Sequence, residues 1–353
     1  MGRPRALVAV VAGALLLAGC GSGPSQVGAA AVIGDRSISI DRVQNLIDKA
    51  IREQPYAQKL AAEHKLDVLG RAVVGQLVLH ELLAEAAEKQ GIAPDYAKAD
   101  AQLANDPLNG QVPADSGDET QAVNQVVART RDHREELTDT YLAQSLADKV
   151  LPDLSVTFDF TTIGVLPDPT TGARLQGADA QKAAFDLARQ FAADPAAAAQ
   201  RIGSDVRSEA AARQRAKQAG QDVDSVPPFT GLGDAVPATQ AGALAATPVY
   251  GSSAGTVTAC PNPDPQLPGT WLVAVIRQRT DDKPVATEKA PELDAATKTA
   301  IGMRQLQPLF DRLGVRINKR YGVWDAVAMA VVPSADAFQG LVLPSGGSGR
   351  TQQ

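Results

Sequence analysis

The segment from Leu66 to Gln90 has the pattern of a long helix that is apolar over most of its circumference. Its charged residues fall within about a third of the helical wheel, and Ala, Val and Leu occupy most other positions. One neighbouring element cannot cover so wide an apolar arc, so we expect other parts of the chain to pack on this helix from at least two sides. Gly91 is a suitable C-cap. Gln76 and His80 lie four residues apart within the arc, and we interpret them as an internal hydrogen-bonded pair.

The patterns around this helix predict a mainly helical N-terminal region. Residues 29–33 are a short apolar run followed by a Gly-Asp turn, which predicts a strand. Ser39 or Asp41 is a suitable N-cap for the helix that follows. Apolar residues at spacings of three and four return over residues 122–150 and predict more helix there.

The composition changes at Leu151 and Pro152, where strand-forming residues become more frequent. Residues 156–165 are rich in Val, Thr, Phe and Ile and predict a strand. The continuous apolar run at 271–276 predicts a central strand, and two helices are expected between these strands. Residues 207–224 are charged and alanine-rich without an apolar stripe, which indicates an exposed helix or a mobile insertion and not a functional site.

The C-terminal part is predicted to return to the first region. Residues 291–313 have helical periodicity interrupted by Pro308. The alternation over residues 315–318 predicts a strand that pairs with the first one, and the apolar run 326–332 is suited to covering the core. Residues 345–353 are Gly, Ser and polar residues, which is typical of a disordered end.

Size and charge limit the possible functions. The 353 residues, 44% of them hydrophobic, are enough for two domains. The formal net charge is −6 and no long basic run occurs, which argues against nucleic acid as a partner. The histidines lie on separate predicted helices, and no Walker or Rossmann motif is present, so we expect no metal site and no cofactor.

Residues 1–19 have the pattern of a bacterial signal peptide, with a basic start and an apolar stretch too short to span a bilayer. This stretch runs into Leu17-Ala18-Gly19-Cys20, which resembles a bacterial lipobox. The resemblance implies cleavage between Gly19 and Cys20 and attachment of lipid to the Cys20 sulfur. We therefore expect a chain anchored to the lipid bilayer on the extracytoplasmic face of the cell membrane. The alternative is an ordinary secretory leader with an unrelated cysteine.

Two further motifs are interpreted as having no function. If Cys20 carries lipid, Cys260 has no partner for a disulfide, and we interpret it as a surface thiol in a proline-rich loop, not as a redox sensor. Residues 251–255 match the G-x-S-x-G pattern of hydrolases. No histidine follows to act as the base, so we regard the match as chance.

The order of predicted elements resembles that of extracytoplasmic foldases of the SurA and PrsA type. The residues that carry the resemblance are Ala31-Val32-Ile33-Gly34-Asp35 with Ile38-Ser39, and Ala87 to Pro94, behind the lipobox. In that family an N-terminal chaperone domain, similar to trigger factor, is completed by the C-terminal helix, and a parvulin prolyl-isomerase domain lies between. The resemblance implies an α+β, mainly helical fold.

The resemblance also implies a division of the chain into five parts. These are a lipoprotein signal peptide (residues 1–19), the lipidated cysteine with a tether (20–28), a SurA-like chaperone domain (29–150 with 290–332), a degenerate parvulin-like domain (151–289) and a flexible tail (333–353).

The middle segment departs from parvulins where their catalytic residues lie. A parvulin usually has a histidine in its first strand and another in its last, whereas the chain has no histidine after His133. Val206, after Ser204-Asp205, occupies the position of the family's reactive Cys or Asp. Because the barrier to prolyl isomerisation is about 20 kcal/mol, we expect little or no catalysis without these groups. The candidates for lining an apolar peptide groove are Phe158, Phe160, Phe229 and Trp271, and each is also a candidate core residue.

The expected function is that of a membrane-anchored chaperone that binds unfolded or newly exported polypeptides without prolyl-isomerase catalysis. Three alternatives stay open: an active peptidyl-prolyl cis-trans isomerase, a solute-binding lipoprotein of a transporter, and a structural envelope lipoprotein. A solute-binding lipoprotein needs two α/β lobes with parallel strands, and too few strands are predicted in the first half of the chain.

Overall fold

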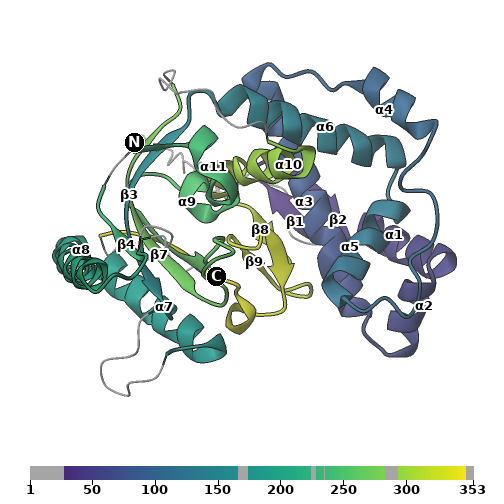
Figure 1. The fold of residues 1–353 in the computed structure, drawn as a ribbon. Helices are drawn as coiled ribbons and strands as arrows, with labels where there is room; N and C mark the ends of the chain where they lie inside the picture. The colour runs from purple at the N-terminus through teal and green to yellow at the C-terminus, as the bar shows by residue number, and fades with distance from the viewer. Residues whose placement is uncertain (1–27, 166–173, 224–227, 234, 283–292, 347–353) are drawn as a thin grey trace, which may run out of the picture.

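The structure, a computed structural model, describes residues 28–165, 174–223, 228–233, 235–282 and 293–346. It has two lobes, one mainly helical and one built on a larger sheet (Figure 1). The fold is therefore α+β, as the sequence predicts. Gly19 and Cys20, with the rest of the predicted leader and the tether up to residue 27, lie outside the described residues.

The helical lobe combines residues 28–150 with residues 295–332. Its helices are α1 (Ile40–Glu53), α2 (Pro55–Ala62), α3 (Leu66–Gln90), α4 (Tyr96–Leu103), α5 (Glu119–Thr130), α6 (His133–Val150), α10 (Ala295–Arg304) and α11 (Gln307–Leu313). In the part of the chain that the structure describes, no helix is both long and apolar enough to cross a bilayer.

A small sheet joins the two ends of the chain in this lobe. The strand β1 (Ala29–Ile33) pairs with β2 (Arg36–Ser39) on one side and with β8 (Arg316–Ile317) on the other, both antiparallel. Ala31 lies opposite Ile317, which confirms the predicted pairing. The Ser39 side chain accepts a hydrogen bond from the Arg42 amide and caps α1.

The helix α3 begins and ends at the predicted residues. Gly91 ends it in the left-handed conformation, with φ of 65°, and its N–H donates to the carbonyls of Ala87 and Glu88. The helices α1, α2, α5 and α6 pack on it from the N-terminal part of the chain. Its buried side chains also share one core with Leu306, Phe310 and other C-terminal residues. The expectation that α3 is packed from at least two sides is confirmed.

The C-terminal hairpin lies directly against α3. It consists of β9 (Val323–Asp325) and β10 (Ala330–Val332). At Gly75 of α3 an added Cβ would lie 3.5 Å from the Val331 amide nitrogen, so the helix backbone and the hairpin are in close approach. The apolar run predicted to cover the core therefore does so as a hairpin.

Two helix boundaries differ from the prediction. Residues 122–150 form two helices, because the Asp132 side chain accepts the Glu135 amide hydrogen bond and starts α6 as a new helix. Pro308 does not kink a continuous helix. It lies in the first turn of α11, where the missing N–H of a proline costs nothing, and the break comes before it, at Gln305 and Leu306.

The second lobe, the sheet lobe, is built on an antiparallel sheet in the order β11-β6-β7-β3-β4, with β5 also paired to β3. Its strands are β3 (Ser155–Ile163), β4 (Thr230–Gly231), β5 (Ala235–Pro237), β6 (Thr256–Pro261), β7 (Trp271–Thr280) and β11 (Leu341–Pro344). The predicted central strand is confirmed, because β7 lies between β6 and β3. Every described strand pair is antiparallel, which removes the parallel lobes that the solute-binding alternative needs.

Helices cover both faces of the large sheet. The helices α7 (Gly177–Ala193) and α8 (Pro195–Gln218) pack on one face. The short helix α9 (Pro248–Gly251), the 3-10 turns η1 (Ala238–Gln240) and η2 (Gly242–Ala246), and α10 pack on the other. The second face therefore adjoins the helical lobe, and the α7 and α8 face points away from it (Figure 1).

The prediction of a flexible tail over residues 333–353 is wrong for its first part. After the 3-10 turn η3 (Ala335–Ala337), β11 pairs with β6 over four residues, with Leu341 opposite Ala259. An added Cβ at Gly340 would overlap the Ala259 carbonyl, so only glycine allows this approach. The apolar run Leu341–Leu343 thus supplies an edge strand, and residues 347–353 lie outside the described residues.

The prediction for Cys260 is also wrong. It lies on β6 with 1% of its surface exposed, packed with Leu272 and Ile276 of β7. Burial raises the pKa of the Cys260 thiol to about 12. The residue is a core side chain and not a surface thiol.

The contact between α10 and α6 gives the first testable prediction. A Cβ at Gly302 would overlap the Ala143 carbonyl of α6, so Gly302→Ala forces the two helices apart. We expect the substitution to lower the free energy of unfolding by about 1–3 kcal/mol or more, measured by urea denaturation. The control is Gly203→Ala in α8, where the added Cβ meets no atom closer than 3.6 Å and the higher helix propensity of alanine is stabilising. Equal effects of the two substitutions would show that α10 is not held tightly on α6.

Candidate functional site

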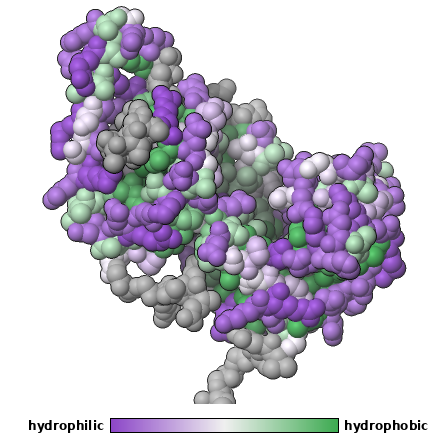
Figure 2. Space-filling view, turned by 90° about the horizontal axis from the view of Figure 1, so that it is seen from below, coloured by the Kyte–Doolittle hydropathy of each residue, from purple (hydrophilic) through white to green (hydrophobic). Residues whose placement is uncertain are grey.

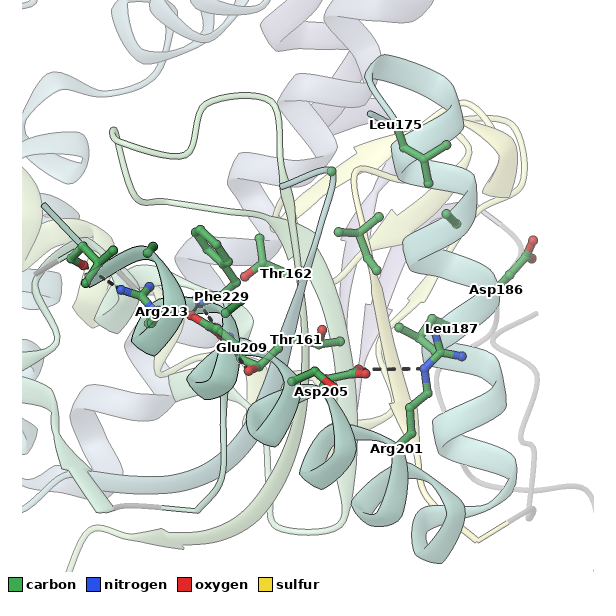
Figure 3. Close-up of a pocket in the computed structure, with 18 of the residues that line it drawn as sticks. Thr161, Thr162, Leu175, Asp186, Leu187, Arg201, Asp205, Glu209, Arg213 and Phe229 are labelled. Carbon is green, nitrogen blue, oxygen red and sulfur yellow. Dashed lines mark hydrogen bonds and ion pairs between the residues drawn. The ribbon is translucent and has the colours of Figure 1, made fainter. Parts of the chain in front are cut away.

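A groove of about 810 Å³ lies between α7, α8 and the end of β3, and we call it the α7–α8 groove (Figure 3). The residues that define it come from these elements and from the segments next to Leu175 and Phe229. They are Thr161, Thr162, Ile163, Gly164, Leu175, Ala183, Asp186, Leu187, Gln190, Arg201, Asp205, Ser208, Glu209, Ala212, Arg213, Ala216, Gln221, Asp222, Val223, Phe229 and Thr230.

One face of α8 forms a wall of the groove. Arg201, Asp205, Ser208 and Ala212 recur at spacings of three and four and so lie on the same side of the helix. The helix starts where the Asp194 carboxylate accepts the amides of Ala196 and Ala197. The charged, alanine-rich stretch after residue 207 continues this helix to Gln218, which confirms the exposed-helix interpretation.

Glu209 holds the segment at Phe229 and Thr230 against α8. Its carboxylate accepts hydrogen bonds from the amides of Phe229 and Thr230 at 2.9–3.1 Å, from the Thr230 hydroxyl at 2.8 Å and from Arg213 Nε at 2.7 Å. Burial alone would raise the pKa of Glu209, but these donors outweigh it and the pKa is lowered. Glu209 is therefore an ionised, fully hydrogen-bonded anchor that fixes the position of Phe229.

The opposite wall contains the apolar side chains of Leu187 of α7, Ile163 of β3 and Leu175, next to the polar side chains of Asp186 and Gln190 of α7. Figure 2 shows apolar side chains on the surface of the sheet lobe, whereas the helical lobe is mainly polar on that face. The groove therefore joins an apolar wall to a helix face with charged groups, which suits the binding of an amphipathic segment.

A second, smaller cavity of about 340 Å³ lies on the other side of β3. Phe158, Phe160 and Leu272 line it together with Pro263 and Pro265 of the segment between β6 and β7. The two phenylalanine rings are tilted against each other with centroids 5.8 Å apart. Only a few atoms of Phe158 reach the cavity, because 6% of its surface is exposed and the rest packs in the core.

The four predicted groove residues do not lie in one groove. Phe229 lines the α7–α8 groove, Phe158 and Phe160 line the smaller cavity, and Trp271 lines neither. Trp271 packs edge-on against Phe185 of α7, with ring centroids 5.5 Å apart. The prediction of a common groove is wrong because alternate residues of a strand face opposite sides of the sheet.

Sequence reasoning missed the residues of α8. The spacing of residues 201, 205, 208 and 212 was a visible signal, but it placed polar residues on one helix face, which is also the pattern of an ordinary solvated surface. Only the packing of α8 beside α7 turns that face toward a cavity.

The helical lobe contains a second cluster of polar groups. His80 of α3 lies with Nδ1 2.8 Å from the Asp139 carboxylate of α6. The Arg131 guanidinium, with 4% of its side chain exposed, pairs with Asp139, Glu135 and Glu136. The predicted pair of Gln76 with His80 is wrong, because the Gln76 amide donates to the Asn124 carbonyl instead.

His80, Glu135 and Asp139 have ligand atoms within 4.8 Å of one another, which is close enough for a metal ion. The Arg131 guanidinium already contacts Glu135 and Asp139 from within the cluster. It supplies the positive charge that an ion would bring, so the arrangement fits an internal ion-pair network between α3 and α6.

Neither cavity has a histidine or a cysteine among its described lining residues. The geometry of the α7–α8 groove provides apolar contact, hydrogen bonds and negative charge, which are the requirements of binding.

Comparison of the sequence with protein-family models and with curated proteins gave no significant match.

The ion-pair network leads to a pH-dependent prediction. Burial alone would lower the pKa of His80, but the hydrogen bond and charge of Asp139 and the charge of Glu135 outweigh it, so the pKa is raised. The folded state then binds this proton more tightly than the unfolded state, and the stabilisation is complete below the unfolded pKa of about 6.5. It is lost as the pH rises through the higher native pKa.

We therefore expect His80→Gln to lower the free energy of unfolding by roughly 1 kcal/mol more at about pH 5.5 than at about pH 9. Thermal unfolding at both pH values measures this difference. The control is His64→Asn, which removes a histidine at an exposed position with φ of 59°, a conformation that asparagine tolerates. A cost of His80→Gln that is the same at both pH values would contradict the assignment.

Proposed function

We propose that this chain is a lipid-anchored extracytoplasmic chaperone that binds unfolded or newly exported polypeptides in the α7–α8 groove. The observation that carries the proposal is the groove itself, a cavity of about 810 Å³ with an apolar wall and a solvated helix face. Its mixed lining of apolar side chains and a charged helix face suits a flexible amphipathic segment of polypeptide.

The chemistry of the groove favours tolerant binding. Its apolar residues are mainly Ala and Leu with one Phe, which bury apolar side chains without demanding a particular shape. The walls come from two helices at the surface of the sheet lobe, so a chain can enter from the side. Binding of this kind is weak for each segment and is useful when the partner exposes many such segments.

The arrangement of the lobes is consistent with a SurA/PrsA-type foldase. The C-terminal helices α10 and α11 and the strand β8 complete the helical lobe, and the sheet lobe is formed mainly by the segment between α6 and α10. We propose that the sheet lobe is a degenerate parvulin-like domain, supported by its antiparallel sheet with two helices on one face.

Anchoring is proposed from the sequence. Leu17-Ala18-Gly19-Cys20 resembles a lipobox, and lipid on Cys20 would hold the chain at the bilayer on the extracytoplasmic side. A chaperone in that position would meet polypeptides as they leave the membrane.

The groove can be tested by filling it. We expect Ala212→Trp to reduce the capacity of the mature chain, carrying Cys20→Ser, to suppress aggregation of an unfolded test protein, because the large side chain occupies the groove. Light scattering measures the aggregation. The matched control is Ala211→Trp, one residue earlier on the exposed surface of α8 and outside the groove. If the parent chain does not suppress aggregation, or if both tryptophan variants are equally impaired, this function is wrong.

We also predict that prolyl isomerisation stays at the background rate in a protease-coupled assay with a proline peptide. The face of β3 that lines the smaller cavity carries Phe158, Phe160 and Thr162, without the histidine usual in parvulins. The described lining of this cavity contains no histidine or cysteine to polarise the amide while it twists over a barrier of about 20 kcal/mol. A rate that rises in proportion to the protein concentration would contradict this prediction and restore the isomerase alternative.

A further inference from the structure

The described lining of the α7–α8 groove contains more negative than positive side chains. Asp186, Asp205, Glu209 and Asp222 contribute carboxylates, and Arg201 and Arg213 contribute guanidinium groups. A groove with excess negative charge attracts cations and repels anionic segments. A ligand cation binds best to a carboxylate whose charge is not already closely paired within the protein.

Two of these carboxylates already have close ion-pair or hydrogen-bond partners within the protein. Asp186 pairs with Lys182 at 2.7 Å and with Arg189 at 3.1 Å. Glu209 uses its oxygens for the Phe229 and Thr230 amides and for Arg213, as described above. A ligand gains little by approaching groups whose hydrogen bonds are already made.

Asp205 differs from both. It projects from α8 into the groove (Figure 3), and its ion-pair partner among the described residues is Arg201, whose Nε lies 4.0 Å from Asp205 Oδ2. This distance is at the limit of an ion pair, and 57% of the Arg201 side chain is exposed to solvent, so the pairing is weak. Burial raises the pKa of Asp205, because the charged form has lost water and has gained too little in return.

A cation of a ligand would provide the positive charge that Asp205 receives only weakly from Arg201. We propose that the α7–α8 groove selects polypeptide segments in which a basic side chain adjoins an apolar stretch, with Asp205 binding the cation. The apolar stretch lies on Leu187, Ile163 and Phe229, and the basic side chain reaches the α8 wall. This inference rests on the proposed function, and it names the class of segment that the groove prefers.

The experiment compares two short fluorescent peptides that differ in one residue. Both carry the same apolar stretch, and one has arginine where the other has citrulline, which is neutral and of similar shape. Fluorescence anisotropy with the mature chain carrying Cys20→Ser measures the affinities. We expect the arginine peptide to bind about threefold to tenfold more tightly, with a preference that decreases as salt is added.

Asp205→Asn should remove this preference, so that the arginine peptide and the citrulline peptide bind the variant with equal affinity. The matched control is Asp179→Asn, which makes the same charge change at an exposed position of α7 outside the groove, and it should keep the preference. In the unsubstituted chain the preference should also fall as the pH is lowered from about 8 to about 4, because Asp205 becomes protonated. Asp186 and Glu209 are carboxylates of the same groove, so the Asn variant at position 205 assigns the effect.

The outcomes separate this inference from the proposed function. If both peptides bind equally and Ala212→Trp weakens both, the groove binds polypeptides but the charge preference is wrong. A preference that survives Asp205→Asn assigns the cation to another group and overturns the role of Asp205. If neither peptide binds, the proposed function fails and this inference fails with it.

Discussion

The apolar circumference of α3 is the constraint on which the rest of the structure depends. Its buried residues lie on several sides of the helix, among them Leu69, Val74, Leu77 and Leu83. No single helix or sheet covers such a surface. The chain meets the requirement by wrapping α1, α2, α5 and α6 around the helix and by returning from its far end with α11 and the β9–β10 hairpin.

This return fixes where the sheet lobe leaves and rejoins the helical lobe. The outgoing helix α6 and the incoming helix α10 lie side by side, and Gly302 allows their backbones to meet at Ala143. The segment between them must therefore start and end at neighbouring points. An antiparallel sheet suits this condition, because its first strand, β3, and its last strand before the return, β7, are adjacent and run in opposite directions.

The junction between the lobes is held by polar as well as apolar contacts. Arg304 at the end of α10 is 8% exposed, and its guanidinium donates to the carbonyls of Ala246, Ala326 and Val327. One buried side chain thus connects the 3-10 turn η2 of the sheet lobe to the C-terminal hairpin of the helical lobe. The strand β11 then carries the chain back to the sheet. The sheet that supports the α7–α8 groove is therefore fixed by contacts with the helical lobe and by its pairing with the C-terminal strand β11.

The features that could be predicted from the sequence are those with local causes. The bounds of α3 follow from its periodicity and from Gly91. The strand β1 follows from a short apolar run and β8 from a short alternating run, although the two strands pair across most of the chain. The features that were missed depend on distant partners. The strand β11 is four residues long and pairs with β6 about eighty residues away, so its short apolar run alone does not indicate that it joins the large sheet. Likewise, the spacing within α3 relates His80 to Gln76, whereas the partner that the fold brings to it is Asp139.

The α7–α8 groove is also a feature that depends on distant partners. The environments of its carboxylates explain why a sequence pattern does not reveal it. Glu209 and Asp205 are one turn apart on α8 and look equivalent in the sequence, yet the fold gives them opposite environments. Glu209 meets the amides of Phe229 and Thr230 and becomes part of the scaffold, so its pKa is lowered. Asp205 lies at the cavity with only a weak ion pair to Arg201, and burial raises its pKa. The difference between these two carboxylates is therefore created by the neighbours that tertiary packing supplies.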